Sequence, residues 1–476
     1  MIRRWAPLAA GPLLYLIVVL VGPAGMAEPA RRVAALAVWM VAWWLTGAVP
    51  LAATALLPLV FLPFAGVSSV EEVSRRYADP IVFLFMGGFF LAAASERWGL
   101  HRRLAFAVIA LVGTEASRVV LAVMLATALV SMWISNTATA AMMLPITVAL
   151  VALARREAPE RAKAFGTALV LGMAYAASIG GVATLIGTPP TAIFAAAAKS
   201  LAGRPVGFAE WMGIGVPVSG VMLAVCWVLL VRVMFSVRGP LGGVAELVAR
   251  ERAALGPWSA GERTTVVVLA VTALCWVFRE PKTLGSVVFP GLTTVLSATS
   301  DAGIAIAAAL LLFAIPVSLV ERRFALDWEA ARRIPWDVLI LFGGGLALAT
   351  GFEASGLAAW LAGRLEILRG APTIAATGAV ALFFVLLTEL TSNTATAAMG
   401  MPLAASLAPA LGLPPVGLMA AAALGSALGF MLPVGTPPNA LAYGTGAVTA
   451  GEMARAGVWL DITGAGVITI AVIIWA

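Results

Sequence analysis

The feature that most constrains this chain is a string of eight residues that occurs twice. Ser-Asn-Thr-Ala-Thr-Ala-Ala-Met begins at Ser135 and again at Ser392, both times inside an apolar segment. A second pair follows in the same order, because Gly-Thr-Pro-Pro begins at Gly187 and again at Gly435. Polar and helix-breaking residues at matching places in two apolar halves indicate an internal repeat with a binding site between its halves.

Composition defines the class of protein. The chain is 62% hydrophobic and 11% charged, with a mean hydropathy of +1.02. Apolar runs of about 20 residues, the length of one bilayer crossing, recur along it. His101 is the only histidine, and Cys226 and Cys275 both lie in apolar runs. We therefore expect a polytopic membrane protein with no histidine proton relay, disulfide framework or cysteine metal site.

The order of the segments predicts the fold. Two segments, 118–153 and 372–410, hold the Ser-Asn-Thr strings at their centres and are too long for one span, so we expect re-entrant hairpins. Two more, 164–198 and 414–448, are helices broken at Gly-Thr-Pro-Pro. Full spans are expected near 6–23, 33–49, 51–66, 80–96, 212–235, 263–279, 303–320, 337–352 and 456–475. The predicted fold is all-α, with an inverted-topology repeat, about 11 transmembrane helices and two re-entrant helical hairpins.

We divide the chain into a first repeat (1–235), a cytoplasmic linker (236–262) and a second repeat (263–476). The N-terminal stretch resembles a signal peptide, but the repeat needs this helix, so we interpret it as a retained first span. With a cytoplasmic N-terminus, about two thirds of the Lys and Arg residues lie inside. This orientation places the C-terminus outside, the 118–153 hairpin on the inner side and the 372–410 hairpin on the outer side.

The broken segments predict an anion site. Ser, Asn and Thr are N-cap residues, and they stand just ahead of helix-forming runs in both strings. Pro189 and Pro437 suit first helical positions. The result is four half-helix N-termini, which present free N–H groups and partial positive charge. An anion can bind there without a Lys or Arg side chain.

The same breaks supply oxygen atoms. A hydroxyl residue stands five positions before each asparagine: Ser131 before Asn136, and Thr388 before Asn393. The freed carbonyls that would complete the two shells are those near Ser135, Gly187, Thr391 and Gly435. Unwound carbonyls of this kind coordinate sodium. A dianion in an apolar site needs compensating charge, so we expect two or more Na⁺ ions.

Single features have simpler interpretations. Ser, Thr and Asn in membrane helices often only join neighbouring helices, and it is the set of four breaks that favours a site. Glu389 is an intramembrane carboxylate and a functional candidate. The residue that matches it in the first repeat is Met132. A direct cation or proton role stays open for Glu389, and a hydrogen-bonded support role is favoured.

At these residues the chain resembles the divalent anion–sodium symporter family of sodium-coupled di- and tricarboxylate and sulfate transporters. The likeness lies in Ser131-Met-Trp-Ile-Ser135-Asn136-Thr137, in Thr388-Glu-Leu-Thr391-Ser392-Asn393-Thr394 and in the two Gly-Thr-Pro-Pro strings. It covers essentially the whole chain and implies eleven spans, a homodimer in the inner membrane and elevator-type alternating access. One departure is Thr191, which stands where family members often carry Asn, whereas Asn439 is present in the second copy.

The resemblance also implies site residues. One sodium site would comprise Ser131, Asn136 and Gly187, and the other Thr388, Asn393 and Gly435. The residues that would touch substrate carboxylates are Ser135, Asn136, Thr137, Ser392, Asn393 and Thr394. The pocket would be lined by Thr188, Pro189, Thr436 and Pro437. The implied activity is sodium-coupled symport of a divalent anion, with a C4-dicarboxylate such as succinate as the expected substrate.

Other classes stay open. The family also contains sodium-independent dicarboxylate exchangers, from which the retained hydroxyls and asparagines distinguish this chain only in part. An ion antiporter or metalloid-anion pump subunit of the wider ion-transporter group also uses hairpins and inverted repeats, but a proton-coupled form should carry acidic residues in both breaks. A membrane-embedded enzyme is disfavoured, because no His/Asp/Cys constellation occurs at membrane depth.

Overall fold

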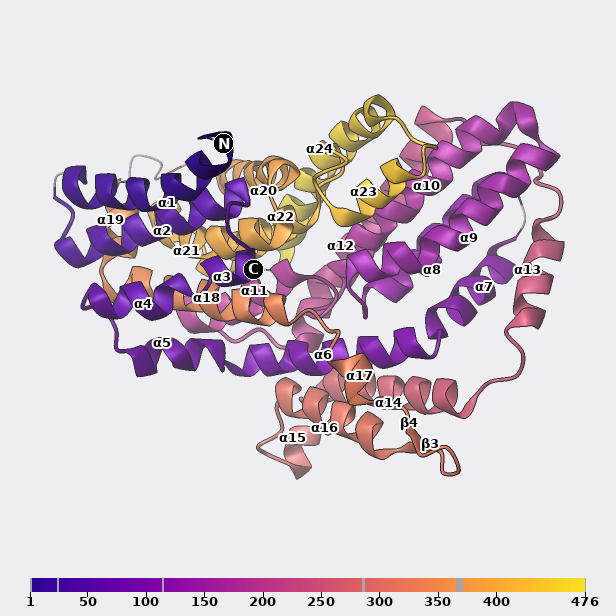
Figure 1. Cartoon of the computed structure of the whole chain (residues 1–476), viewed down its shortest axis with the longest axis horizontal. Coiled ribbons are helices and arrows are strands. Elements are labelled where there is room, and N and C mark those ends of the chain that lie inside the picture. Colours follow the sequence, from indigo (N-terminus) through magenta and orange to yellow (C-terminus); the bar gives the residue numbers. More distant parts are fainter. Residues whose placement is uncertain are drawn as a thin grey trace.

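A computed structural model describes residues 2–23, 25–113, 115–284, 287–364, 370 and 372–475. Within them the chain is almost entirely helical, and nine helices are long and apolar enough to cross a membrane. Their apolar side chains form one continuous core. This arrangement confirms the predicted class, an all-α polytopic membrane protein (Figure 1).

The elements follow the order expected for a repeat. The first half contains α1 (Ile2–Val21), α2 (Glu28–Thr46), α3 (Leu51–Thr54), α4 (Leu57–Phe64), α5 (Val70–Tyr77), α6 (Pro80–Arg97), α7 (Leu100–Val112), α8 (Ala116–Ser131), α9 (Asn136–Glu157), α10 (Pro159–Gly181), α11 (Pro189–Ala202) and α12 (Phe208–Val228), which continues as a π-helical turn, η1 (Leu229–Met234). The second half begins after α13 (Val244–Ala254). It contains α14 (Ala260–Val277), β1 (Lys282–Leu284), β2 (Val287–Phe289), α15 (Leu292–Val295), α16 (Asp301–Ala314), β3 (Pro316–Ser318), β4 (Arg323–Phe324), α17 (Trp328–Ala331), α18 (Trp336–Ala354), α19 (Leu357–Arg364), α20 (Thr373–Leu390), α21 (Asn393–Leu411), α22 (Pro415–Ala427), α23 (Pro437–Gly444) and α24 (Ala450–Trp475).

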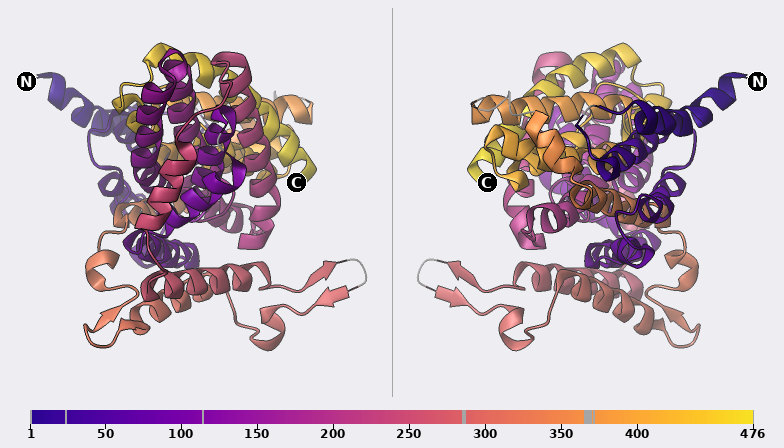
Figure 2. Two further views of the ribbon diagram at one scale, coloured as in Figure 1. Left: turned by 90° about the vertical axis from the view of Figure 1, so that its right-hand side faces the viewer. Right: turned by 90° about the vertical axis from the view of Figure 1, so that its left-hand side faces the viewer.

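Two of the expected spans are interrupted. The segment 51–66 divides into α3 and α4, because Pro58 enters the first turn of α4 and cannot donate to a continuing helix. The expected span 303–320 ends at Ala314, after which β3 and β4 pair as an antiparallel ribbon. A second ribbon, β1–β2, projects sideways from the lower helices (Figure 2).

The two helical hairpins and the two broken helices interlock. In the first half α8 and α9 form a hairpin and α10 and α11 form a broken helix; α20–α21 and α22–α23 are their counterparts. Helix α11 packs against α21 and α22, while α23 packs against α9 and α10. Each half therefore places one half-helix on the hairpin of the other, near the middle of the molecule (Figure 1).

The central helices α10 and α22 are enclosed on all sides. Every residue from 165 to 181 and from 416 to 427 is buried. Both stretches are rich in Ala and Gly, whose small side chains let neighbouring membrane helices approach closely. A helix that is apolar all round suits such a position, and the ends of these two helices are where the breaks occur.

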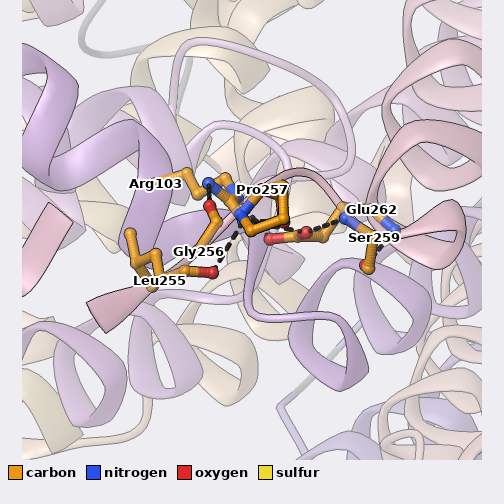
Figure 3. A network of polar contacts seen from close by, with 6 residues as sticks. All are labelled: Arg103, Leu255, Gly256, Pro257, Ser259 and Glu262. Carbon is orange, nitrogen blue, oxygen red and sulfur yellow. Dashed lines mark hydrogen bonds and ion pairs between the residues drawn. The ribbon is translucent and has the colours of Figure 1, made fainter. Parts of the chain in front are cut away.

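The expected linker, 236–262, contains a helix, α13, that packs against α7. Arg103 of α7 holds the end of this linker. Its guanidinium donates to the carbonyl oxygens of Leu255, Gly256 and Pro257, each at 3.0 Å (Figure 3). It also pairs with Glu262 in the first turn of α14. The linker is thus a folded connection rather than a free tether.

Candidate functional site

Four breaks at the centre of the molecule each precede a helix. They comprise residues 132–135, 182–188, 391–392 and 428–436, and the helices that follow are α9, α11, α21 and α23. Ser135 Oγ accepts a hydrogen bond from Ala138 N at 3.4 Å, and Thr436 Oγ1 accepts one from Asn439 N at 3.2 Å. The four half-helix N-termini expected from the sequence are therefore present, two of them with side-chain caps.

The backbone of the two broken helices is nearly the same in both halves. Thr188 has φ −145° and ψ 145°, and Thr436 has φ −139° and ψ 150°. Both residues are 2% exposed. Because the two residues share this extended conformation, α11 and α23 leave their breaks with the same local backbone geometry.

In the first half, Ser131 and Asn136 lie side by side with backbone carbonyls. The Ser131 hydroxyl lies 3.0 Å from the Asn136 amide and 2.6 Å from the Ala177 carbonyl oxygen. The same terminus of the amide lies 3.1 Å from Ala177 O and 3.3 Å from Gly187 O. That terminus faces only acceptors, so the amide nitrogen belongs there and donates to the two carbonyls.

The second half repeats this cluster. Thr388 Oγ1 lies 2.8 Å from Asn393 Oδ1 and 2.8 Å from the Ser426 carbonyl oxygen. Thr388 is fully buried, as Ser131 is. The hydroxyl–asparagine pairing expected five residues apart is therefore made in both repeats, each time beside a carbonyl at the end of a central helix.

Glycines leave room for these clusters. A Cβ atom at Gly181 would collide with Asn136 Oδ1, and one at Gly187 would lie 2.9 Å from the Ser131 carbonyl oxygen. In the second half a Cβ at Gly429 would lie 3.0 Å from Thr388 Cγ2. Any side chain at these positions would displace the paired polar groups.

The side chains at the expected carbonyl positions make contacts of their own. The Ser135 hydroxyl caps α9. The Thr391 hydroxyl donates to Leu387 O at 2.9 Å and contacts the Thr396 hydroxyl, away from Thr388. The Gly435 backbone lies beside Glu389, since an added Cβ would be 2.8 Å from Glu389 Oε2. The Ser135 and Thr391 hydroxyls are thus engaged outside the two clusters, and the backbone carbonyls at these positions stay the proposed contributors.

The residues expected to contact substrate lie around the breaks and differ in solvent exposure. Ser392, Asn393 and Thr394 are half-buried, as are Ser135 and Asn136. The others are Thr137 and Pro437, which are exposed, and Pro189, which is half-buried. Together with the buried Thr188 and Thr436 they stand at the N-terminal ends of the half-helices.

Glu389 is held by the second break. Its Oε1 accepts a hydrogen bond from Met431 N at 2.7 Å and its Oε2 accepts one from Leu432 N at 2.9 Å. These two contacts match the favoured support role, because a carboxylate that accepts two backbone N–H bonds fixes the loop that donates them.

Thr191 and Asn439 also serve their breaks in similar ways. The Thr191 hydroxyl lies 2.7 Å from Thr188 O and 2.9 Å from Leu185 O. The Asn439 amide donates to Leu432 O at 3.1 Å. The threonine found in place of asparagine therefore still ties the start of its half-helix to the break before it.

Sequence reasoning missed several contributors. Backbone carbonyls of Ala177 and Ser426 face the hydroxyls, and no residue type marks such a carbonyl. Gly181 and Gly429 could have been found, because they are separated by the same offset as Gly187 and Gly435. Asp461 of α24, which lies near Glu389, is not part of any motif found in the sequence.

The donor set suits a hard monovalent cation and an anion together. Hydroxyl, amide and carbonyl oxygens are the ligands that such cations take from protein. Half-helix N-termini favour negative charge. The break segments contain no Lys or Arg, so a bound anion would have to be neutralised by these dipoles and by co-bound cations.

Comparison with known proteins agrees with this geometry. A polytopic helical protein with paired hairpins and broken helices that interlock at its centre is a secondary transporter in its architecture. The whole of residues 2–476 matches the model of the sodium:sulfate symporter transmembrane region. The chain belongs to that family, which confirms the resemblance to the divalent anion–sodium symporters, and it is a transporter rather than an enzyme.

Individual relatives are similar along most of their length. The chain is 40% identical over 473 residues to the sodium-dependent dicarboxylate transporter SdcS of Staphylococcus saprophyticus, covering 98% of this chain and 90% of that one. Two solved structures share the fold at low identity. MtrF of Neisseria gonorrhoeae, described within a class of antimetabolite efflux pumps, has a TM-score of 0.55 at 13% identity and 97% coverage of both chains. The Alcanivorax borkumensis YdaH transporter has 0.56 at 15% identity, over 94% of this chain and 98% of that one.

Proposed function

We propose that this protein is a sodium-coupled symporter of a divalent anion, with a C4-dicarboxylate such as succinate as its substrate. The observation that carries the proposal is the repeated hydroxyl–asparagine–carbonyl cluster, Ser131 with Asn136 and Thr388 with Asn393. Each cluster lies at a half-helix N-terminus. The name of the relative, sodium-dependent dicarboxylate transporter, supports the same substrate and ion.

The coupling follows from charge. Each cluster would hold one sodium ion through uncharged oxygens, so two ions would bring two positive charges to the site. A dianion between the half-helix N-termini would then complete a nearly neutral load. Without sodium the anion would meet only partial charges in a region of low dielectric, where an uncompensated charge is costly. Anion affinity should therefore depend steeply on sodium.

The finer features rest on the family resemblance and stay predictions: elevator motion, a homodimer, a cytoplasmic N-terminus and an external C-terminus. The interlocked packing of α11 on α21 and α22, and of α23 on α9 and α10, supports a single body that carries the site. Rigid movement of such a body past a fixed scaffold would give alternating access.

Uptake of labelled succinate into proteoliposomes tests the proposal. An inward sodium gradient should raise initial uptake by at least about tenfold over choline, because the ions supply the charge that the site lacks. Potassium in place of sodium serves as the control for ionic strength and membrane potential. Equal uptake in all three media would contradict symport and favour the sodium-independent exchanger.

A further inference from the structure

Asp461 of α24 is a buried carboxyl group that the proposed transport site does not use. It is 1% exposed, and neither of its oxygens has a hydrogen-bond partner among the residues that the structure describes. Its helix packs on α20, and its carboxyl group lies near that of Glu389. A buried polar group without a partner is costly, so this position requires an explanation.

The fold brings the two acids together at the second break. Gly457 lies one turn before Asp461 on α24, and a Cβ atom there would collide with the backbone of Phe430 and Met431. Residues four apart share a helix face, so Asp461 faces the same break. Glu389 reaches this place from α20 and accepts from the amides of Met431 and Leu432.

The contacts of Glu389 assign the donor role to Asp461. Backbone N–H groups donate to both oxygens of Glu389, so this group acts as an acceptor on both sides. A second carboxylate in contact with it would be strongly repelled at low dielectric. Tyr175 of α10 and Cys226 of α12 are the other titratable groups close by, and neither supplies positive charge. Asp461 therefore fits as a neutral acid, whose O–H donates to Glu389.

The first half of the chain lacks both acids at once. Met132 stands at the position of Glu389. Gly215 of α12 packs on the carbonyls of Val182 and Ala183, as Gly457 packs on the second break. One turn after it, at the position of Asp461, stands Ser219. The joint presence of the acids in one half and their joint absence from the other favour a role as a pair.

The pair lies next to the second cluster. Glu389 directly follows Thr388 in the chain, and a Cβ at Gly435 would lie 2.8 Å from Glu389 Oε2. A Cβ at Gly429 would lie 3.2 Å from Glu389 Oε1 and 3.0 Å from Thr388 Cγ2. The Glu389 carboxylate therefore lies beside the backbone of both glycines, next to the residue whose hydroxyl would hold sodium.

We propose that Asp461 is a positioning residue that acts through Glu389 on the second sodium shell. Its neutral carboxyl group donates a hydrogen bond to Glu389, which keeps Glu389 on the amides of Met431 and Leu432 and so fixes the shape of the second break. The inference rests on the proposed sodium-coupled function and adds a residue to it.

Two substitutions at Asp461 test the role of the donor. Asp461→Asn keeps the shape and a neutral N–H donor, so the sodium concentration for half-maximal succinate uptake should stay within about twofold of wild type. Asp461→Leu removes the donor and should raise that concentration about tenfold, with little change in maximal uptake. Ser219→Ala, at the matching position of the first half, is the control and should leave sodium dependence unchanged.

A second measurement is independent of transport: the sodium-induced rise in melting temperature of the purified protein. Asp461→Asn should keep this rise, and Asp461→Leu should require about tenfold more sodium for it. If Asp461→Leu does not fold, Glu389→Gln is measured in its place. The amide NH₂ group of the substituted side chain would face the N–H of Met431 or Leu432, so one of the two hydrogen bonds to the break would be lost.

The outcomes separate the inference from the proposed function. If Asp461→Asn loses sodium dependence as Asp461→Leu does, a charged carboxylate is required and the neutral-donor role is wrong. Unchanged sodium dependence in Asp461→Leu would also overturn the inference. A wild-type protein with neither sodium-dependent uptake nor a sodium-induced melting shift would instead overturn the symporter proposal.

Discussion

The two broken helices share one backbone shape, but the second break has a contact that the described residues do not show at the first, a buried carboxylate. In the first break, side chains donate to carbonyls: Trp211 Nε1 donates to Val182 O at 2.9 Å, and Thr184 Oγ1 donates to Met132 O at 2.5 Å. In the second break, the Glu389 carboxylate accepts from two amides of the loop. Uncharged donors also serve the second break, where Tyr175 donates to Phe430 O and Asn439 donates to Leu432 O. The same geometry is thus reached with uncharged donors in one half, and with uncharged donors plus a buried acid in the other.

This difference separates function from support. The contacts that hold each break have changed between the halves, whereas the hydroxyl–asparagine pair is present in both: Ser131 with Asn136, and Thr388 with Asn393. A broken helix at membrane depth needs its freed backbone groups satisfied, and many side chains can do so. A cation shell needs oxygens at fixed places, so fewer solutions are open there.

The largest loss of transport is expected from substitution of the two asparagines, one in each half. Asn136→Ala and Asn393→Ala should each abolish sodium-dependent succinate uptake, because each removes the amide at the centre of a cluster and leaves buried hydroxyl and carbonyl groups without it. Uptake into proteoliposomes at matched protein content is the measurement. Thr463→Ala is the control, since this exposed hydroxyl bonds only carbonyls of its own helix.

Near-normal uptake by either alanine variant would mean that the two repeats do not contribute equivalent sites. The two hydroxyl–asparagine clusters, which are the most similar parts of the two halves, would then differ in function, and the prediction that they are paired sites would be wrong.

A smaller effect is expected at the glycines beneath the clusters. Gly181→Ala should lower uptake at subsaturating sodium by about tenfold or more, because its methyl group would collide with the Asn136 amide. Gly429→Ala should lower it about threefold, since its nearest neighbours, at 3.0 Å and 3.2 Å, are side-chain atoms of Thr388 and Glu389. Sodium titrations of uptake measure both.

Gly220→Ala provides the matched control for these variants, because an added Cβ on this α12 residue meets nothing within 4 Å. A larger loss in Gly429→Ala than in Gly181→Ala would reverse the expected order and indicate that the second cluster is the less tolerant one.

The smallest effect concerns a contact that crosses between halves. The Tyr175 hydroxyl of α10 donates to Phe430 O of the second break at 2.9 Å. Tyr175→Phe removes this bond and leaves the buried carbonyl without it, at a cost of about 1 kcal/mol. The melting temperature of the purified protein should fall by a few degrees or less, while uptake at saturating sodium stays within about twofold. A loss as complete as that of Asn393→Ala would show that Tyr175 belongs to the site itself.

Much of the site was predictable because its breaks are local events. Ser135 and Thr436 cap the helices that follow them, as their residue types predict, and prolines begin α11 and α23. The five-residue spacing placed Ser131 beside Asn136 and Thr388 beside Asn393, since each pair closes across one break. These contacts depend on short stretches of chain, whose geometry the sequence strongly restricts.

The remaining parts depend on helices that meet only in the folded protein. The Ala177 and Ser426 carbonyls that face the two hydroxyls come from α10 and α22, and no residue type in the strings marks them. The pairing of Asp461 with Glu389 requires α24 to pack on α20. The division of the expected span 51–66 follows from Pro58, a signal that hydropathy alone overlooks.

The interlocked half-helices bear on how such a chain could arise. Helix α11 is buried against α21 and α22, and α23 against α9 and α10, so neither half has a closed core of its own. A half-length ancestor would have left these apolar faces and the broken backbone beside them unsatisfied. Such a half would need a second copy of itself to cover these faces. Joining two copies in one chain supplies that partner permanently, and leaves each copy free to hold its break by its own contacts.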